Sequence, residues 1–214
     1  MSENSLPRTI SVSGTGRVSV VPDVADLRLG VTITTKTVEA ARSTNAAVMT
    51  GVIGALRELA IAPEDIQTTN LTLSPAYDYS SNPNPPRLTG YTLTNAVAVT
   101  VRDLAMVGAV IDGSLGAGAT SLDSISFRNR DSAAAENSAR QAAVADARAK
   151  ADVLAAAAGV SIAGVASITE SGTLEVAPMY RGGIAKMAMA DASTPVEAGA
   201  NEIAISVSVT FLLG

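Results

Sequence analysis

The chain alternates between segments with apolar residues at every second position and segments with apolar residues every three or four positions. Within residues 24–35, polar side chains alternate with four apolar ones, Leu27, Leu29, Val31 and Ile33. This period of two is typical of a half-buried β-strand. The same criterion predicts strands over residues 65–74, 88–101, 121–128, 165–170 and 202–213.

The first strand-like region contains two glycines. Thr9–Ser13 and Arg17–Val21 have strand character and flank Gly14–Gly16. Glycine pairs between strands usually mark a turn or a bulge, so we expect two short strands joined there. A phosphate-binding loop is not favoured, because no helix follows and no third glycine stands at the required spacing.

Three segments have helical periodicity. The first covers residues 37–59, with Thr37 as its N-cap. The second covers residues 104–115, with Asp103 as its N-cap. The third begins at Asp131 or Ser132, is rich in alanine, and ends at Gly159. Its many alanines predict close packing against a sheet or a second helix, and charges four residues apart suit an exposed face.

The predicted order is β-α-β-β-α-β followed by α-β-β. It indicates an α+β fold in which helices cover antiparallel sheets. Residues 1–8 form a tail and residues 9–214 one domain. Weak internal similarity divides that domain into halves at about 9–102 and 103–214.

Two irregular segments hold the candidate interaction residues. Residues 74–87 are rich in proline, serine and asparagine and are expected to project as a loop at the tip of a hairpin. This loop carries Tyr77, Asp78 and Tyr79, and exposed aromatic side chains often mark contacts between proteins. Residues 171–199 contain Met179 and Tyr180, which suit either an adaptable apolar contact or a lid over the core.

Composition excludes several kinds of chemistry. Hydrophobic residues make up 47% of the chain and charged residues 16%, so the chain is globular rather than disordered. Histidine and cysteine are absent, which removes thiol nucleophiles, disulfides and the usual zinc ligands. We therefore expect neither a cofactor nor a metal.

The charge and hydropathy of the chain indicate which kinds of partner it can bind and where it can reside. The net charge is −5 without a basic cluster, so nucleic acid is not an expected partner. The longest uncharged run, residues 153–169, contains two glycines and several polar residues, so no transmembrane helix is expected. The first residues lack the basic and apolar regions of a signal peptide, which predicts a cytoplasmic protein if the chain is the whole native product.

Asp23 and Asp26 bracket the start of one strand and are examples of carboxylates that a small-ligand-binding or hydrolytic domain could use. Such a domain would need a concave polar pocket that holds both carboxylates together. Turn and cap roles account for them more simply.

Three blocks of sequence, read in order, resemble the bacterial SIMPL-domain family. The blocks are ISVSGTGRVSVVPDVADLRLGV at residues 10–31, the alanine-rich run at residues 139–171, and Pro195-Val196-x-x-Gly199 before residues 203–213. With the strand at Gly90-Tyr91, the resemblance spans nearly the whole chain.

The resemblance implies an α+β fold and a protein of the periplasm or cell envelope, immunogenic in some pathogens. It also implies a possible role in stress response, and at least one relative forms a ring-like homo-oligomer with a channel-like centre. No catalytic residue is carried over. Together with the residues, it favours a non-enzymatic, self-assembling protein. The alternatives are an adaptor that binds a protein partner through residues 74–87 and 171–199, and a small-ligand-binding or hydrolytic domain.

Overall fold

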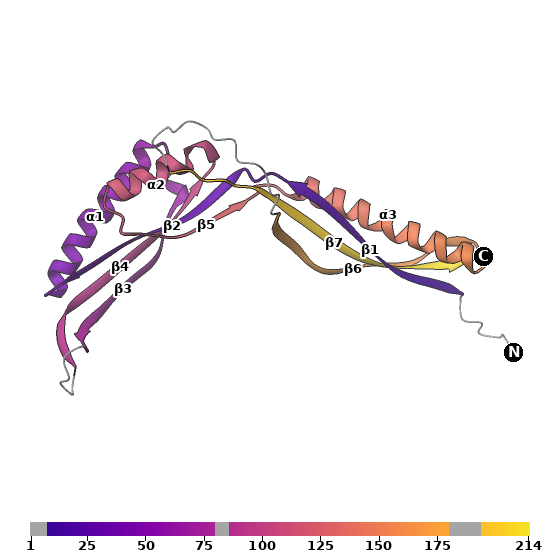
Figure 1. Cartoon of the computed structure of the whole chain (residues 1–214), viewed down its shortest axis with the longest axis horizontal. Helices are drawn as coiled ribbons and strands as arrows, with labels where there is room; N and C mark the ends of the chain where they lie inside the picture. Colours follow the sequence, from indigo (N-terminus) through magenta and orange to yellow (C-terminus); the bar gives the residue numbers. More distant parts are fainter. Residues whose placement is uncertain (1–7, 80–85, 180–193) are drawn as a thin grey trace. The chain divides into compact units, whose positions relative to one another are not determined.

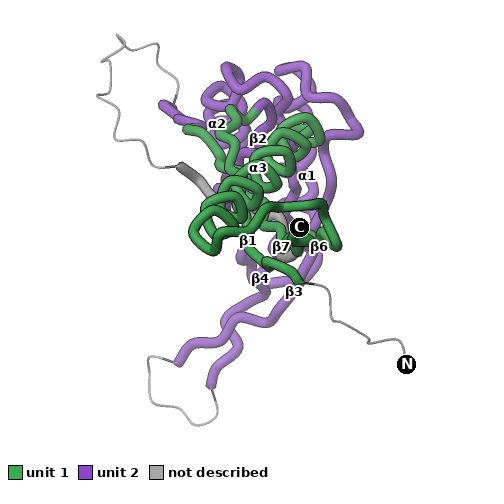
Figure 2. The backbone as a smooth tube through the Cα atoms, turned by 90° about the vertical axis from the view of Figure 1, so that its right-hand side faces the viewer, with its two compact units in different colours: residues 1–22, 129–183, 199–214 green, residues 23–128, 184–198 purple. Residues whose placement is uncertain are grey.

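The computed structural model describes residues 8–79, 86–179 and 194–214, and the chain divides into two compact units. Unit 1 comprises residues 1–22, 129–183 and 199–214, and unit 2 comprises residues 23–128 and 184–198. Figure 2 shows the two units in different colours. Each unit has its own antiparallel sheet with helix packed against it, which confirms the predicted α+β fold class.

Unit 1 is a three-stranded sheet with one long helix. The strands are β1 (Thr9–Val20), β7 (Ala200–Leu213) and β6 (Ile162–Met179), in the order β1-β7-β6. Both neighbouring pairs are antiparallel. The helix α3 (Ala133–Ala157) runs along this sheet (Figure 1) and contacts β1 more extensively than β7.

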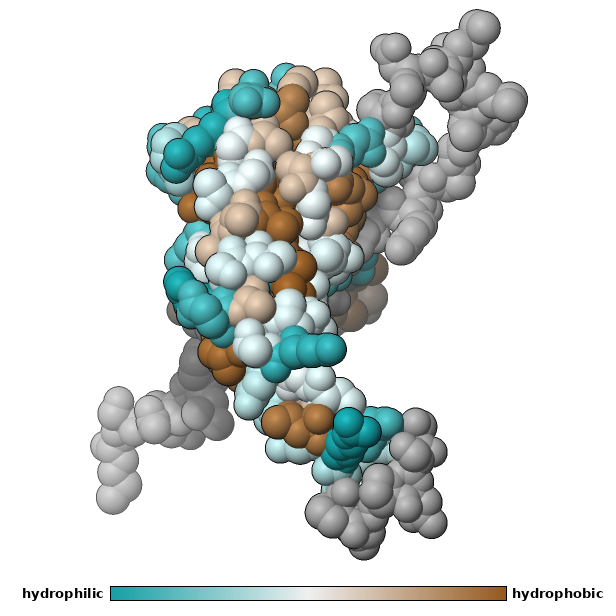
Figure 3. All heavy atoms as spheres, turned by 90° about the vertical axis from the view of Figure 1, so that its left-hand side faces the viewer, coloured by the Kyte–Doolittle hydropathy of each residue, from teal (hydrophilic) through white to brown (hydrophobic). Residues whose placement is uncertain are grey.

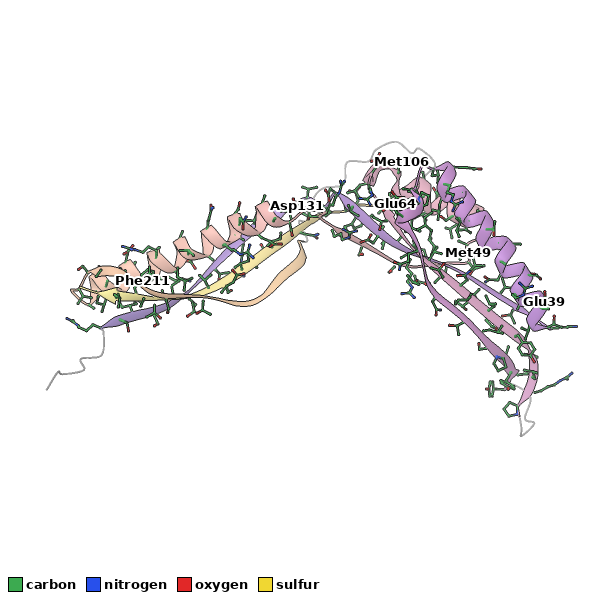
Figure 4. All side chains as sticks on the ribbon, turned by 180° about the vertical axis from the view of Figure 1, so that it is seen from behind. Glu39, Met49, Glu64, Met106, Asp131 and Phe211 are labelled. Carbon is green, nitrogen blue, oxygen red and sulfur yellow. The ribbon has the colours of Figure 1, made fainter. Side chains whose placement is uncertain are left out.

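The core of unit 1 is a stripe of alanines against a row of branched side chains. Five alanines of α3 spaced four residues apart are buried: Ala139, Ala143, Ala147, Ala151 and Ala155. Residues at this spacing share one helix face. The first four alanines lie against alternate residues of β7, namely Ile203, Ile205, Val207, Val209 and Phe211. Phe211 is labelled near one end of the helix in Figure 4.

Gly14 and Gly16 lie within one continuous strand, so the predicted turn or bulge between two short strands is wrong. Both residues pair in regular register, with Val207 and Ile205 of β7. A Cβ on Gly14 would lie 2.0 Å from the Ala143 carbonyl oxygen, and one on Gly16 would lie 1.9 Å from that of Ala139. The two glycines therefore allow α3 to pack close to β1, and they do not reverse the direction of the chain.

The ends of α3 agree with the predicted caps. The Asp131 carboxylate accepts a hydrogen bond of 2.9 Å from the amide of Ala133. Gly159 has φ +68, the left-handed conformation that commonly ends a helix.

Unit 2 contains a four-stranded antiparallel sheet. Its strands are β3 (Ile66–Asp78), β4 (Arg87–Val101), β2 (Val24–Thr35) and β5 (Ser121–Arg128), in the order β3-β4-β2-β5. Strands β3 and β4 form the predicted hairpin. β3 and β5 are the edge strands of this sheet.

The helices of unit 2 pack over the central strands. Helix α1 (Val38–Glu58) contacts β2, β4 and α2 (Val107–Gly116). Thr37 caps α1 by accepting a hydrogen bond from the Ala40 amide, as predicted. The helix expected from residue 104 begins instead as a 3₁₀ turn, Leu104–Met106, and continues as α2.

The core of unit 2 is built from β2, β4 and the helices that cover them. Fully buried side chains include Leu27, Leu29, Val97, Val99 and Leu56. Met49 projects from α1 (Figure 4) and is 4% exposed. Asn45 is the buried polar residue of this helix, and its amide donates to the Val31 carbonyl at 2.8 Å.

Two strands are longer than the sequence indicates. β3 continues to Asp78, and β6 runs from Ile162 to Met179, so residues 74–78 and 175–179 are paired, with a shift of register in β6 between Ser171 and Glu175. Pro75 is compatible with β3 because an edge strand has one side on which no amide donor is required. The two units also follow boundaries other than the halves 9–102 and 103–214, whose internal similarity stays a prediction.

Replacing Gly16 by Ala tests the contact between β1 and α3. We expect Gly16→Ala to lower the free energy of unfolding by about 2 kcal/mol or more, because the new methyl group would force the helix away from the strand. Gly164→Ala in β6 is the matched control, since a Cβ there meets nothing within 4 Å. Urea unfolding followed by circular dichroism measures both, and equal effects would contradict the interpretation.

Candidate interaction surfaces

The described end of the β3–β4 hairpin carries the predicted aromatic residues. The rings of Tyr77 and Tyr79 meet edge to face, with centroids 6.3 Å apart and an angle of 63°. Tyr77 is 44% exposed and Tyr79 75% exposed. Asp78 lies opposite Arg87 in the strand register. Figure 3 shows hydrophobic and strongly polar residues next to one another at this end of the hairpin.

Exposed apolar side chains continue from the tyrosines along β3. Leu71 is 67% exposed and Leu73 is 45% exposed. They lie opposite Asn95 and Leu93 of β4, on the same face of the sheet as the core residues Val97 and Val99. α1 packs over β2 and β4, so the leucines of the outer strand remain exposed. We call the exposed set the hairpin stripe: Leu71, Leu73, Tyr77, Tyr79 and Leu88.

The hairpin is anchored at the end of β2. A Cβ on Gly90 would lie 2.3 Å from the carbonyl oxygen of Thr35, so β4 passes close to the last residue of β2. Beside this contact, Lys36, Asp78, Arg87 and Gly90 help line a hollow of about 410 Å³. Charged side chains therefore lie beside the hairpin stripe at the loop end of the hairpin, where Asp78 and Arg87 face each other.

The sequence did not identify Leu71 and Leu73 as surface residues. Their alternation with Thr72 and Ser74 is the same pattern that marks a buried strand face. Only the sheet order, which makes β3 an edge strand outside the cover of α1, leaves them exposed. The lack of charged residues between Ile66 and Tyr77 gives no warning of an exposed strand.

The second predicted group lies largely outside the described residues. Met179 is the last residue of β6 and pairs with Ala200, but its side chain is not among those described. Tyr180 lies outside the described residues altogether. Their predicted contact role stays a prediction, as does that of Tyr77, Asp78 and Tyr79.

The two carboxylates considered for ligand binding or hydrolysis belong to the framework of unit 2. The Asp26 carboxylate accepts hydrogen bonds from Arg128 at 2.5 Å and from the Thr100 hydroxyl at 2.8 Å. Partial burial raises the pKa of Asp26, but the hydrogen bonds from Arg128 and Thr100 outweigh it and hold the pKa below its usual value. The backbone amide of Asp23 donates to the carbonyl of Arg128 at 3.2 Å. These contacts tie β2 to β4 and β5.

A second hollow of unit 2 contains an ion pair. It has a volume of about 500 Å³ and is lined by apolar side chains that include Ile61 and Met106, beside Asp65 and Arg102. The Arg102 guanidinium donates two hydrogen bonds to Asp65, of 2.7 and 2.8 Å. These hydrogen bonds raise the pKa of Arg102. The two hydrogen bonds tie the 3₁₀ turn Pro63–Asp65 to the residue that follows β4, so the arrangement suits a structural link.

The described part of the chain has neither a cluster of metal ligands nor a membrane-spanning helix. No group of three or more aspartates and glutamates there is placed to hold a metal ion. None of the helices in residues 8–79, 86–179 and 194–214 is long and apolar enough to cross a membrane.

Comparisons with known proteins identify the family of the chain. Residues 10–211 match the model of the SIMPL family, which is described as a protein of unknown function (DUF541). The chain is 36% identical to the 26 kDa periplasmic immunogenic protein of Brucella melitensis, over 96% of this chain and 84% of the relative. It is 34% identical to the uncharacterized protein YggE of Escherichia coli, over 68% of this chain and 58% of the relative.

Replacing Asp26 by Asn tests its structural role. Because its pKa is lower in the folded protein, Asp26 adds stability above the ordinary pKa of 3.8, and that stability is lost as the pH falls through the lower folded pKa. We expect Asp26→Asn to be less stable by about 1 kcal/mol at pH 7, an estimate that allows for partial solvent screening. In strong acid the difference should shrink.

The matched control is Asp123→Asn on the neighbouring strand β5. Asp123 reaches Arg28 only at 3.9 Å and both side chains are nearly half exposed, so its loss should change stability little at any pH. Urea unfolding at pH 7 and in acid measures both variants. A difference for Asp26→Asn that grows on acidification would contradict the assigned role.

Proposed function

The chain belongs to the SIMPL family, and from that premise we propose that it is an extracytoplasmic protein that acts by associating with further copies of itself and not by catalysis. The single observation that supports self-association is the hairpin stripe. It places large exposed apolar or aromatic side chains along the edge strand β3 and at the loop end of the β3–β4 hairpin. Contiguous apolar patches on a soluble protein usually mark interaction surfaces.

The strand beneath the stripe lacks the usual protection of a sheet edge. Edge strands commonly carry lysine or other charged residues that discourage pairing with another chain. β3 has no charged residue between Ile66 and Tyr77, and its exposed face carries Leu71 and Leu73. Its outer backbone groups can pair with another strand up to Ser74, since Pro75 has no amide hydrogen.

The location outside the cytoplasm rests on the relatives. The Brucella melitensis and Brucella abortus relatives, both 36% identical over 211 residues, are named periplasmic proteins. A chain without cysteine folds in either redox environment, so the composition is compatible with export. A role in the cell envelope or in stress response belongs to the same proposal.

A second candidate function is an adaptor that binds another protein through the end of the hairpin. The observation that favours it is the exposed edge-to-face pair of Tyr77 and Tyr79, because tyrosine is enriched in protein interfaces. Deleting the whole of residues 74–87 would remove paired residues of β3 and β4. Tyr79 also belongs to the hairpin stripe, so Tyr79→Ser separates the two functions only in comparison with Leu71→Lys, which leaves the tyrosine pair in place.

Replacing Leu71 by Lys tests self-association. A lysine in the stripe introduces a charge that would have to be buried between copies, so we expect the mass in solution to fall toward that of one chain. Leu71 is largely exposed, and the fold should tolerate the change. Leu122→Lys on the other edge strand, β5, is the matched control and should leave the mass unchanged.

Light scattering coupled to size-exclusion chromatography measures the mass of each variant across a range of concentrations. A wild-type protein that remains a single chain at the highest concentration would overturn the proposal. An assembly that survives Leu71→Lys, together with loss of partner capture in Tyr79→Ser, would favour the adaptor instead.

A further inference from the structure

Unit 1 has a groove along the outer edge of its sheet. β1 is an edge strand, and α3 lies closer to it than to the other strands because Gly14 and Gly16 admit the helix backbone. The helix and the strand edge enclose an open hollow of about 710 Å³. It is lined by residues 11–13 of β1 and by Ala149, Lys150, Val153 and Leu154 of α3.

Two side chains of α3 already bond to the outer edge of β1. The Lys150 ammonium donates to the Ser13 carbonyl at 3.0 Å, and the Asp146 carboxylate accepts from the Thr15 amide at 2.9 Å. The two groups also pair with each other at 2.7 Å. Lys150 and Asp146 take the place of a neighbouring strand at Ser13 and Thr15. The backbone groups of these two residues therefore point away from β7 and can form hydrogen bonds on the outer side of β1.

The groove continues beyond these two side chains toward the start of β1. Ser11 lies two residues before Ser13, so its amide and carbonyl point to the same outer side. We call the side of the groove formed by α3 the helix wall. On it, Val153 is 70% exposed and Leu154 is 48% exposed. The side chains of Ile10 and Val12 face α3 and are half-buried. A strand added at residues 9–13 would therefore gain both backbone hydrogen bonds and apolar contacts.

We propose that this groove receives the β1 strand of a second copy, antiparallel and centred on Ser11. The inference rests on the self-association proposed above but uses a different surface, in unit 1. The pairing has two-fold symmetry, so each copy supplies the same strand and the same helix wall. It joins two three-stranded sheets into one sheet of six strands.

Self-complementarity of sequence and charge favours a second copy as the occupant. Pairing centred on Ser11 places Ile10 of one copy opposite Val12 of the other, on the side of the helix wall. It also places Arg8 opposite Gly14, next to Asp146, so a positive charge meets a negative one at each end. The Ser13 carbonyl has two lone pairs and can accept from Lys150 and from the added strand together.

Disulfide formation in a chain with a single cysteine tests this pairing directly. The natural sequence contains no cysteine, so Ser11→Cys introduces the sole thiol. Residues that face each other at a hydrogen-bonded antiparallel pair have Cα atoms about 5.5 Å apart, within the range that a disulfide spans. Mild oxidation should give a covalent dimer, measured on a non-reducing gel.

Ser19→Cys is the matched control. Ser19 is exposed on the same strand and the same face as Ser11, but the proposed register places no copy of residue 19 opposite it. We expect at least about tenfold more dimer for Ser11→Cys, because disulfide formation requires this close and specific geometry.

Arg8→Glu added to Ser11→Cys tests the charge contact. Both Arg8–Asp146 pairs become repulsive, so the dimer yield should fall by about fivefold, whereas Arg8→Lys should retain most of it. Arg8 lies before β1 and is exposed, so its replacement leaves the fold intact.

Equal dimer yields from Ser11→Cys and Ser19→Cys would overturn the inference. So would an assembly detected by light scattering in which Ser11→Cys does not crosslink, a result that leaves self-association through the hairpin stripe standing. A Ser11→Cys chain that crosslinks to a different protein and forms no homodimer would also overturn the inference. The occupant of the groove would then be an extended segment of that other protein. Dimers of Ser11→Cys that persist with Leu71→Lys would support this interface and show that it forms independently of the hairpin stripe in unit 2.

Discussion

The close contact between β1 and α3 is the constraint on which unit 1 depends. Gly14 and Gly16 lie directly beneath the carbonyl groups of Ala143 and Ala139, and no other residue type fits there without displacing the helix. Small residues on both sides let the helix backbone approach the strand, while β7 supplies the bulk of the core with its isoleucines, valines and Phe211. The same contact draws α3 toward the edge of the sheet, where Asp146 and Lys150 can reach the backbone of β1.

Both sheets have edge strands, and the side chains that lie beside β1 in unit 1 differ from those on β3 in unit 2. In unit 1, an ion pair from α3 covers the middle of β1, so only its first residues can accept a further strand. In unit 2, α1 lies over the central strands, and the outer strand β3 keeps its leucines in contact with solvent. An edge strand without charged residues is a template for pairing. The distribution of charge at the edges therefore determines where another chain can add.

The sequence predicted the parts of the fold that depend on local periodicity. The strand at residues 24–35, the helix capped by Thr37 and the end of α3 at Gly159 all agree with the structure. It failed at Gly14–Gly16, because glycine at a turn and glycine under a helix look alike until the partner helix is placed. It also missed Leu71 and Leu73, since alternation shows that a strand has an apolar face but not whether a helix covers that face. The sequence predicted charges four residues apart on the exposed face of α3, and Asp146 and Lys150 form such a pair, although the bonds of these side chains to β1 depend on tertiary contacts.

The two interfaces proposed for this chain, one in each unit, would together determine the form of its assembly. A single two-fold interface ends at a dimer, because each copy then has no equivalent surface left to offer. A second interface elsewhere on the chain links such dimers further, into a closed ring when the rotation between them closes and into an open filament when it does not. The surface of unit 2 is held by side-chain burial along β3, whereas that of unit 1 combines backbone pairing with charges at its ends. Because charges are screened by salt and apolar contacts are not, the unit 1 contact is the one whose strength depends on ionic strength.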